Sequence, residues 1–82
     1  MLLLVPISAS LPMFEHTARE IAQEMSRDPS APAQDIARRA RELTELFHSW
    51  GTEEPPPDSR TQAIQSVLDL HREAEEHKAN RR

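Results

Sequence analysis

The distribution of proline and glycine divides this chain into three segments, each long enough for a helix. Pro6 and Pro12 lie near its start, residues 28–32 interrupt its middle with the sequence DPSAP, and Gly51 and residues 55–57 interrupt it again. Proline lacks the N–H that a helix interior needs, and its ring clashes with the preceding turn, so helices usually end at such positions. The sequence therefore predicts separate short helices joined by breaks.

Each segment carries apolar residues at alternating spacings of four and three, which places them on one face of a helix. The segments cover roughly residues 12–27, 33–50 and 58–74. Their apolar positions are Phe14, Ala18, Ile21 and Met25 in the first, Ile36, Ala40, Leu43, Leu46, Phe47 and Trp50 in the second, and Ala63, Ile64, Val67, Leu68 and Ala74 in the third, where His71 lies on the same side. The predicted fold class is mostly α, with two or three amphipathic helices.

Residues at the ends of the segments predict helix boundaries. Gly51 stands just past the second segment, where a C-terminal cap is expected, and Ser59 and Gln62 have the spacing of a capping box. Beyond Ala74 the sequence EEHKANRR offers no large apolar anchor, so we expect this tail to fray. The predicted units are an N-terminal apolar segment 1–12, a helical pair 13–51, a proline-rich spacer 52–58 and a C-terminal helix 59–82.

The spacer leaves two arrangements open for the third helix. Its sequence EEPPP favours an extended polyproline conformation, which is semi-rigid. The third helix is then either held apart, with a partner of its own, or packed back on the first two as a three-helix bundle.

The composition limits the functions that the chain can have. A domain of 82 residues has a marginal core, so we expect a homo-oligomer or a protein partner. The absence of cysteine removes thiol chemistry and indicates a reducing, cytoplasmic compartment. A net charge of −4 argues against binding nucleic acid by bulk electrostatics. The abundance of Ala and the excess of Arg over Lys suggest a GC-rich, bacterial gene.

Residues that could carry catalysis or bind a metal are scattered. A zinc site needs three or four converging ligands, whereas the histidines here occur in pairs with glutamate that we interpret as solvent-facing ion pairs. The pairs, each four residues apart, are His16 with Glu20, His71 with Glu75, and Glu73 with His77. The single glycine leaves no glycine-rich phosphate loop. We predict a protein that is not an enzyme and has no cofactor, metal or small-molecule substrate.

The uncharged sequence MLLLVPISASLP, residues 1–12, has several interpretations. A secretory signal needs a basic start, and a transmembrane helix needs about 20 apolar residues, so we expect neither and predict no membrane partner. Two interpretations stay open. Translation could begin at Met13, or the alternating apolar residues from Val5 to Leu11 could form an edge strand that pairs with another chain.

Two short motifs carry a resemblance to a known family. ISASLP, ahead of the first amphipathic segment, and SRTQAIQSVLDLHRE, residues 59–73, resemble the strand and the start of the second helix of ribbon-helix-helix regulators. The resemblance implies a short N-terminal β-strand that pairs across a dimer and lies in the major groove of DNA. It also implies DNA-facing residues, with Ser8 and Ser10 at base edges and Ser59, Arg60 and Thr61 at a phosphate.

Two functions follow. In the first, the chain is a small dimeric regulator similar to an antitoxin, which binds DNA through its N-terminal part and a protein through residues 59–82. In the second, it is a helical protein–protein interaction module, an adaptor, inhibitor or small subunit, with no nucleic-acid role. The residues predicted at the oligomer or partner interface are Ile7, Leu11, Leu43, Phe47, Trp50, Ile64, Val67 and Leu68.

Overall fold

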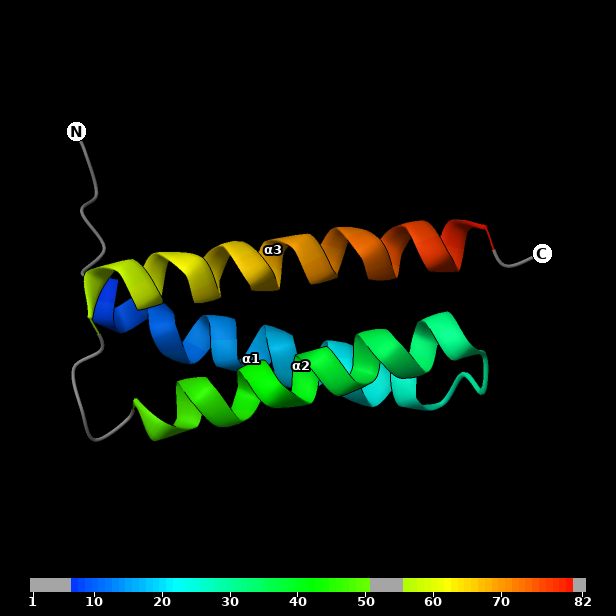
Figure 1. The fold of residues 1–82 in the computed structure, drawn as a ribbon, viewed down its shortest axis with the longest axis horizontal. Coiled ribbons are helices and arrows are strands. Elements are labelled where there is room, and N and C mark those ends of the chain that lie inside the picture. Colours follow the sequence, from blue (N-terminus) through cyan, green and yellow to red (C-terminus); the bar gives the residue numbers. More distant parts are fainter. Residues whose placement is uncertain (1–6, 51–55, 81–82) are drawn as a thin grey trace.

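The computed structural model describes residues 7–50 and 56–80, with side chains described from Leu11 onward. Helix α1 spans Ile7–Ser26, α2 spans Ala31–Ser49 and α3 spans Pro57–Ala79. α2 runs antiparallel to α1, and α3 returns parallel to α1 and contacts both (Figure 1). The mostly α fold class is confirmed, and the proline-rich spacer does not hold α3 apart, because the three helices form one bundle.

Asp28 and Ser30 build the turn between α1 and α2. The backbone of Ser30 is extended, and its Oγ accepts a hydrogen bond from Ala33 N at 3.4 Å, which caps α2. Asp28 Oδ1 accepts one from Ser30 N at 2.9 Å, and Gln34 Nε2 donates to Asp28 O at 2.6 Å. Pro32 lies in the first turn of α2, where backbone N–H groups have no carbonyl partner within the helix. The absence of an N–H on proline therefore costs no hydrogen bond there. The DPSAP sequence thus ends one helix and starts the next.

The core consists of alanines around a few larger side chains. Small side chains let helix axes approach closely, so a short chain can bring three helices into contact. The buried side chains form two clusters, one that includes Met25 and one that includes Phe47. Leu43 packs against both clusters. The buried apolar residues are Ala18, Ile21, Ala22, Met25, Ala33, Ile36, Ala37, Ala40, Phe47, Ala63, Val67, Leu70 and Ala74.

The structure differs from the predicted N-terminal strand over residues 7–12, which are helical. Residues 1–6 lie outside the described part of the chain. Ile7 and Leu11 precede Phe14 at spacings of four and three, so they extend the helical stripe as well as they fit an alternating strand. Leu11 and Phe14 both pack against one of the core clusters. Contact with this core favours the helix over an unpaired strand.

The start of α3 also differs from the prediction. The helix begins at Pro57, with Pro56 at its N-cap and no side-chain cap. Ser59 therefore lies in the first turn and does not serve as the N-cap of a capping box. The fixed φ of proline suits the first helical position, and the carboxylate of Asp58 interacts favourably with the positive end of the helix dipole.

α3 extends to Ala79, past Ala74, where the tail was predicted to fray, and residues 81–82 lie outside the described part of the chain. Polar contacts across the bundle hold this end in place. Lys78 Nζ lies 3.1 Å from Glu24 Oε1 of α1, and His77 Nε2 lies 2.8 Å from Asp28 Oδ2 in the turn before α2. Sequence patterns of apolar residues do not reveal such contacts.

The substitution Pro12→Ala tests whether α1 extends back to Ile7. Pro12 lies inside α1 and has no N–H for the carbonyl of Ser8, an arrangement that costs about 3 kcal/mol in a helix interior. We expect the substitution to raise the free energy of unfolding by about 1–3 kcal/mol in urea titrations and to increase helical circular dichroism.

The matched control is Pro32→Ala, in the first turn of α2, which should change stability by less than about 0.5 kcal/mol. An unchanged or lower stability of Pro12→Ala would contradict a helix over residues 7–12.

Candidate functional site

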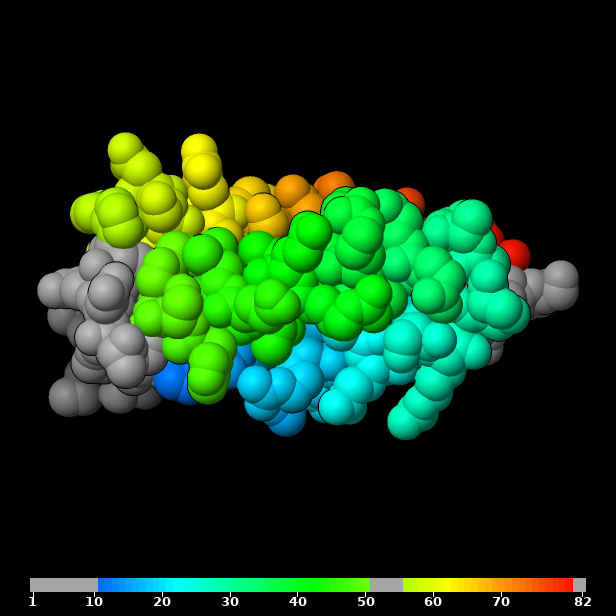
Figure 2. Space-filling view, turned by 60° about the horizontal axis from the view of Figure 1, so that its bottom comes forward, coloured from blue at the N-terminus to red at the C-terminus, as the bar shows by residue number. Residues whose placement is uncertain are grey.

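A groove runs along the surface between α2 and α3, and we call it the α2–α3 groove. It has two halves with volumes of about 350 and 380 Å³, which share Leu43, Leu46 and Ser66. In Figure 2, α2 crosses the front of the molecule with α3 along its upper edge. The residues that line the groove come from both of these helices. A surface of this kind accommodates a long, narrow ligand better than a compact one.

The described residues that line the first half of the groove are all uncharged. Leu46 is 39% exposed there, beside the partly buried Leu43 and Trp50. The ring of Trp50 is fixed by an edge-to-face contact with Phe47, at 5.5 Å between centroids and 82° between planes. The remaining residues that line this half are Pro56, Ser59, Gln62 and Ala63. Small side chains on α3 thus face large apolar ones on α2.

The second half of the groove is acidic. Three carboxylates and one guanidinium line it, and Leu70 of the core closes its floor. These charged residues are Glu42, Asp69, Glu73 and Arg39. The groove therefore changes from apolar to acidic along its length.

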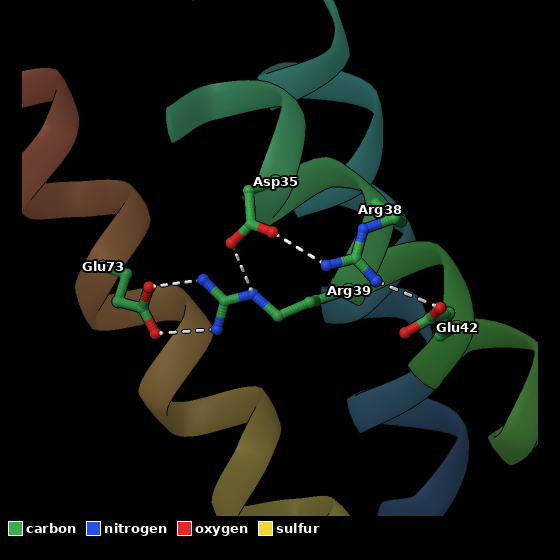
Figure 3. Close-up of polar contacts among 5 residues, drawn as sticks. All are labelled: Asp35, Arg38, Arg39, Glu42 and Glu73. Atoms are coloured by element: carbon green, nitrogen blue, oxygen red, sulfur yellow. Dashed lines mark hydrogen bonds and ion pairs between the residues drawn. The ribbon is translucent and has the colours of Figure 1, made fainter. Parts of the chain in front are cut away.

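An ion-pair network borders the acidic half and links α2 to α3 (Figure 3). Arg39 donates to Glu73 through both terminal nitrogens, at 2.6 and 3.2 Å, and to Asp35 Oδ2 through Nε at 3.0 Å. Arg38 donates to Asp35 Oδ1 at 2.8 Å and to Glu42 Oε2 at 3.3 Å. The bidentate contact with Glu73 fixes the register between the two helices.

The network shifts the pKa values of its members in the directions that favour their charged forms. The hydrogen bond from Arg38, together with the charges of Arg39 and Arg38, lowers the pKa of Asp35 below its ordinary value of 3.8. The hydrogen bond to Glu73 raises the pKa of Arg39, and the hydrogen bond to Asp35 raises that of Arg38. All of these side chains are at least one-third exposed, so solvent screens the interactions.

A second groove, of about 420 Å³, lies between α1 and α3 and is mainly polar. Lys78 Nζ spans it between Glu75 Oε2 at 2.7 Å and Glu24 Oε1 at 3.1 Å. The hydrogen bond to Glu75 raises the pKa of Lys78, and the same bond lowers the pKa of Glu75. No group of three or more carboxylate or imidazole side chains within residues 7–50 and 56–80 is arranged to hold a metal ion.

Asp28, Ser30 and His77 meet at one end of the bundle. His77 Nε2 lies 2.8 Å from Asp28 Oδ2 and 3.4 Å from Ser30 Oγ. A catalytic relay uses the two ring nitrogens for two different partners, whereas here one nitrogen contacts both. Ser30 Oγ also caps α2. The cluster therefore joins α3 to the α1–α2 turn and lacks the geometry of an activated nucleophile.

The residues predicted to face DNA are placed on two helices. Ser8 and Ser10 lie in the first turns of α1, and their side chains are outside the described part of the structure. Arg60 and Thr61 follow Ser59 in the first turns of α3, next to the carboxylate of Asp58 and after Pro57, which has no N–H to offer a phosphate. Thr61 Oγ1 donates to Pro57 O at 3.1 Å.

The residues predicted at an interface divide between the core and two different surfaces. Phe47 and Val67 are buried in this chain's own core, and Leu11 and Ile64 pack against it. The backbone of Ile7 begins α1. Leu43 and Trp50 line the α2–α3 groove, whereas Leu68 is 51% exposed and does not line it.

The sequence prediction missed the acidic half of the groove. Glu73 was expected to pair with His77, but in the structure it pairs with Arg39 across the groove. Glu42 and Asp69 lie on different helices, and only the packing of α3 on α2 brings them to one surface. The polar faces of the two helices are visible in the sequence, but the angle at which they meet is not.

No family model, curated protein or solved structure matches this chain. Among the described residues, no helix has both the length and the apolar character needed to cross a membrane. The candidate site therefore rests on the geometry of the bundle itself.

A pH titration tests the Asp35 network. The pKa of Asp35 is lower in the folded chain than in the unfolded chain, so its stabilisation is present above about pH 4 and is lost as the pH falls through the folded pKa. We expect Asp35→Asn to lower the melting temperature more at pH 6 than at pH 2, measured by circular dichroism. Glu45→Gln is the control, an exposed carboxylate on the same helix. Equal effects of Asp35→Asn at both pH values would contradict the assignment.

A second substitution tests the anchoring of the α3 terminus. His77→Ala removes one partner of Asp28, the contact at Oδ2, and should lower the free energy of unfolding by about 1–3 kcal/mol because Asp28 is only 9% exposed. The control His16→Ala breaks an exposed pair with Glu20 and should cost less than about 0.5 kcal/mol. Equal decreases in the free energy of unfolding of the two variants, measured by urea titration, would contradict this expectation. They would show that the contact between His77 and Asp28 stabilises the fold no more than an exposed ion pair does.

Proposed function

We propose that this chain is a non-enzymatic protein–protein interaction module that binds its partner through the α2–α3 groove. The observation that carries the proposal is the exposure of Leu46 inside a groove that Leu43 and Trp50 also line. Leu46 is not among the buried residues of the core, so its apolar surface is left for another molecule. Burying a fully exposed leucine contributes about 1.5–3 kcal/mol, so covering the 39% of Leu46 that is exposed contributes about 0.6–1.2 kcal/mol.

The form of the groove supports a protein ligand over a small molecule. It runs along two helices, it is open to solvent, and the charged groups among its described lining residues lie at one end rather than converging on a point. Small-molecule sites are usually enclosed and place a few polar groups around one ligand. A tryptophan beside exposed leucine is a common anchor in protein interfaces.

The regulator hypothesis, with DNA binding by an N-terminal strand paired across a dimer, has less support. Residues 7–12 are helical, and the start of α3 presents the carboxylate of Asp58 near Ser59 and Arg60. A carboxylate at this position repels a phosphate and weakens the implied DNA contact.

Affinity capture with the native chain and three variants tests the proposal. We expect a protein recovered with the native chain to be recovered equally with Leu68→Asp and to be lost with Leu46→Asp. Both substitutions add one charge at an exposed leucine, so they differ only in which surface they change. Ser66→Gln, which narrows the groove from the α3 side, should also reduce recovery.

Two outcomes would overturn the proposal. Equal recovery with all versions would exclude the α2–α3 groove as the binding surface. Binding of duplex DNA from upstream of the gene, with an affinity that falls steeply as salt is raised, would favour the DNA-binding regulator instead.

A further inference from the structure

We infer that the α2–α3 groove receives an amphipathic helix of another protein that carries an apolar stripe and a basic terminal turn. This inference rests on the proposed function and names the class of partner. It depends on the contrast between the two halves of the groove, one lined by uncharged residues only and the other by three carboxylates and one guanidinium.

The acidic character persists when neighbouring charges are included. Arg38 pairs with Glu42, and Arg72 pairs with Asp69 at 3.7 Å. The same two arginines also pair with Asp35 and Glu76, so they bring as many negative charges as positive ones. The groove therefore keeps an excess of negative charge at one end, which attracts a cationic side chain.

The dimensions of the groove fit a helix of about three turns. Its α2 wall extends from Arg39 to Trp50, which is about 16 Å at the rise of an α-helix. On α3, Ser59, Ala63 and Ser66 follow spacings of four and three, so small side chains face the groove and let another helix approach closely. Leu43 and Leu46 offer apolar contact along the same length.

The charge gradient also gives the orientation of the partner. Lysine and arginine are most favourable in the last turn of a helix, near the negative end of its dipole. A basic C-terminal turn over Glu42 and Asp69 makes the bound helix antiparallel to α2 and parallel to α3.

Two copies of this chain that meet groove to groove do not supply the required charge to each other. In a two-fold dimer through the α2–α3 groove, the acidic half of each copy would face the uncharged half of the other, so the carboxylates would gain no positive partner. A side-by-side parallel arrangement would oppose the two acidic halves directly. Charge complementarity therefore disfavours groove-to-groove pairing of two copies and favours a partner with a basic terminal turn.

Two synthetic peptides of about 16 residues test this inference. Both carry leucine at spacings of four and three, and their last turns carry either three lysines or three glutamates. We expect fluorescence anisotropy to show that the full chain binds the lysine peptide at least about tenfold more tightly at 50 mM salt, with the difference shrinking at 500 mM.

Variants of the chain assign this binding to the groove. Leu46→Asp should weaken binding of the lysine peptide by about tenfold or more, while Leu68→Asp leaves it unchanged. The double variant Glu42→Lys, Asp69→Lys should reverse the preference and bind the glutamate peptide more tightly. Thermal unfolding of each variant, followed by circular dichroism, checks that the bundle is retained.

Three results would overturn the inference: equal affinity for the two peptides, no binding of either, or an equal loss of binding in Leu46→Asp and Leu68→Asp. A dimer in analytical ultracentrifugation that Leu46→Asp abolishes would identify a second copy as the occupant and overturn it as well. The proposed function is judged separately by affinity capture, because a partner lost only with Leu46→Asp would support a protein-binding groove even if neither peptide binds.

Discussion

Close contact of three helices through alanine is the constraint on which this bundle depends. Ala18, Ala37 and Ala40 are fully buried, and they let α1 and α2 approach closely enough for one short chain to exclude water between them. The larger side chains of Met25, from α1, and Val67, from α3, are almost completely buried in the core. Because alanine adds little apolar area, polar contacts across the helices contribute a larger share of what holds α3 in place.

Those polar contacts are distributed along α3 and have different surroundings. At its C-terminal end, His77 contacts the nearly buried Asp28, where loss of a partner leaves a desolvated carboxylate. In the middle, Arg39 and Glu73 form a bidentate pair whose side chains are more than one-third exposed. Solvent screens this pair, so it contributes little to the free energy of unfolding, but its geometry fixes the register of α3 against α2. The α2–α3 groove owes its shape to this register, since a shift of α3 would separate its apolar and acidic halves.

The sequence allowed the helices to be predicted more fully than the candidate site. The stripes through Met25, Phe47 and Val67 identified core residues that the structure buries. The first residues of α1 were predicted as a strand because a short alternating pattern fits both periods. The acidic half of the groove joins Glu42 to Asp69 from separate helices, and no periodicity within one helix indicates which polar residues of another will lie beside it.

The sequence by itself determined that the chain forms helices, where proline separates them, and which face of each is apolar, because these properties depend on local sterics and on the 3.6-residue period. The tertiary structure alone decided that α3 packs on both other helices, that its last turns contact α1 and the α1–α2 turn, and that Leu46 lies in a groove while Phe47 is buried. These outcomes depend on the rotation and register of each helix against its neighbours, and many small contacts between distant residues set both.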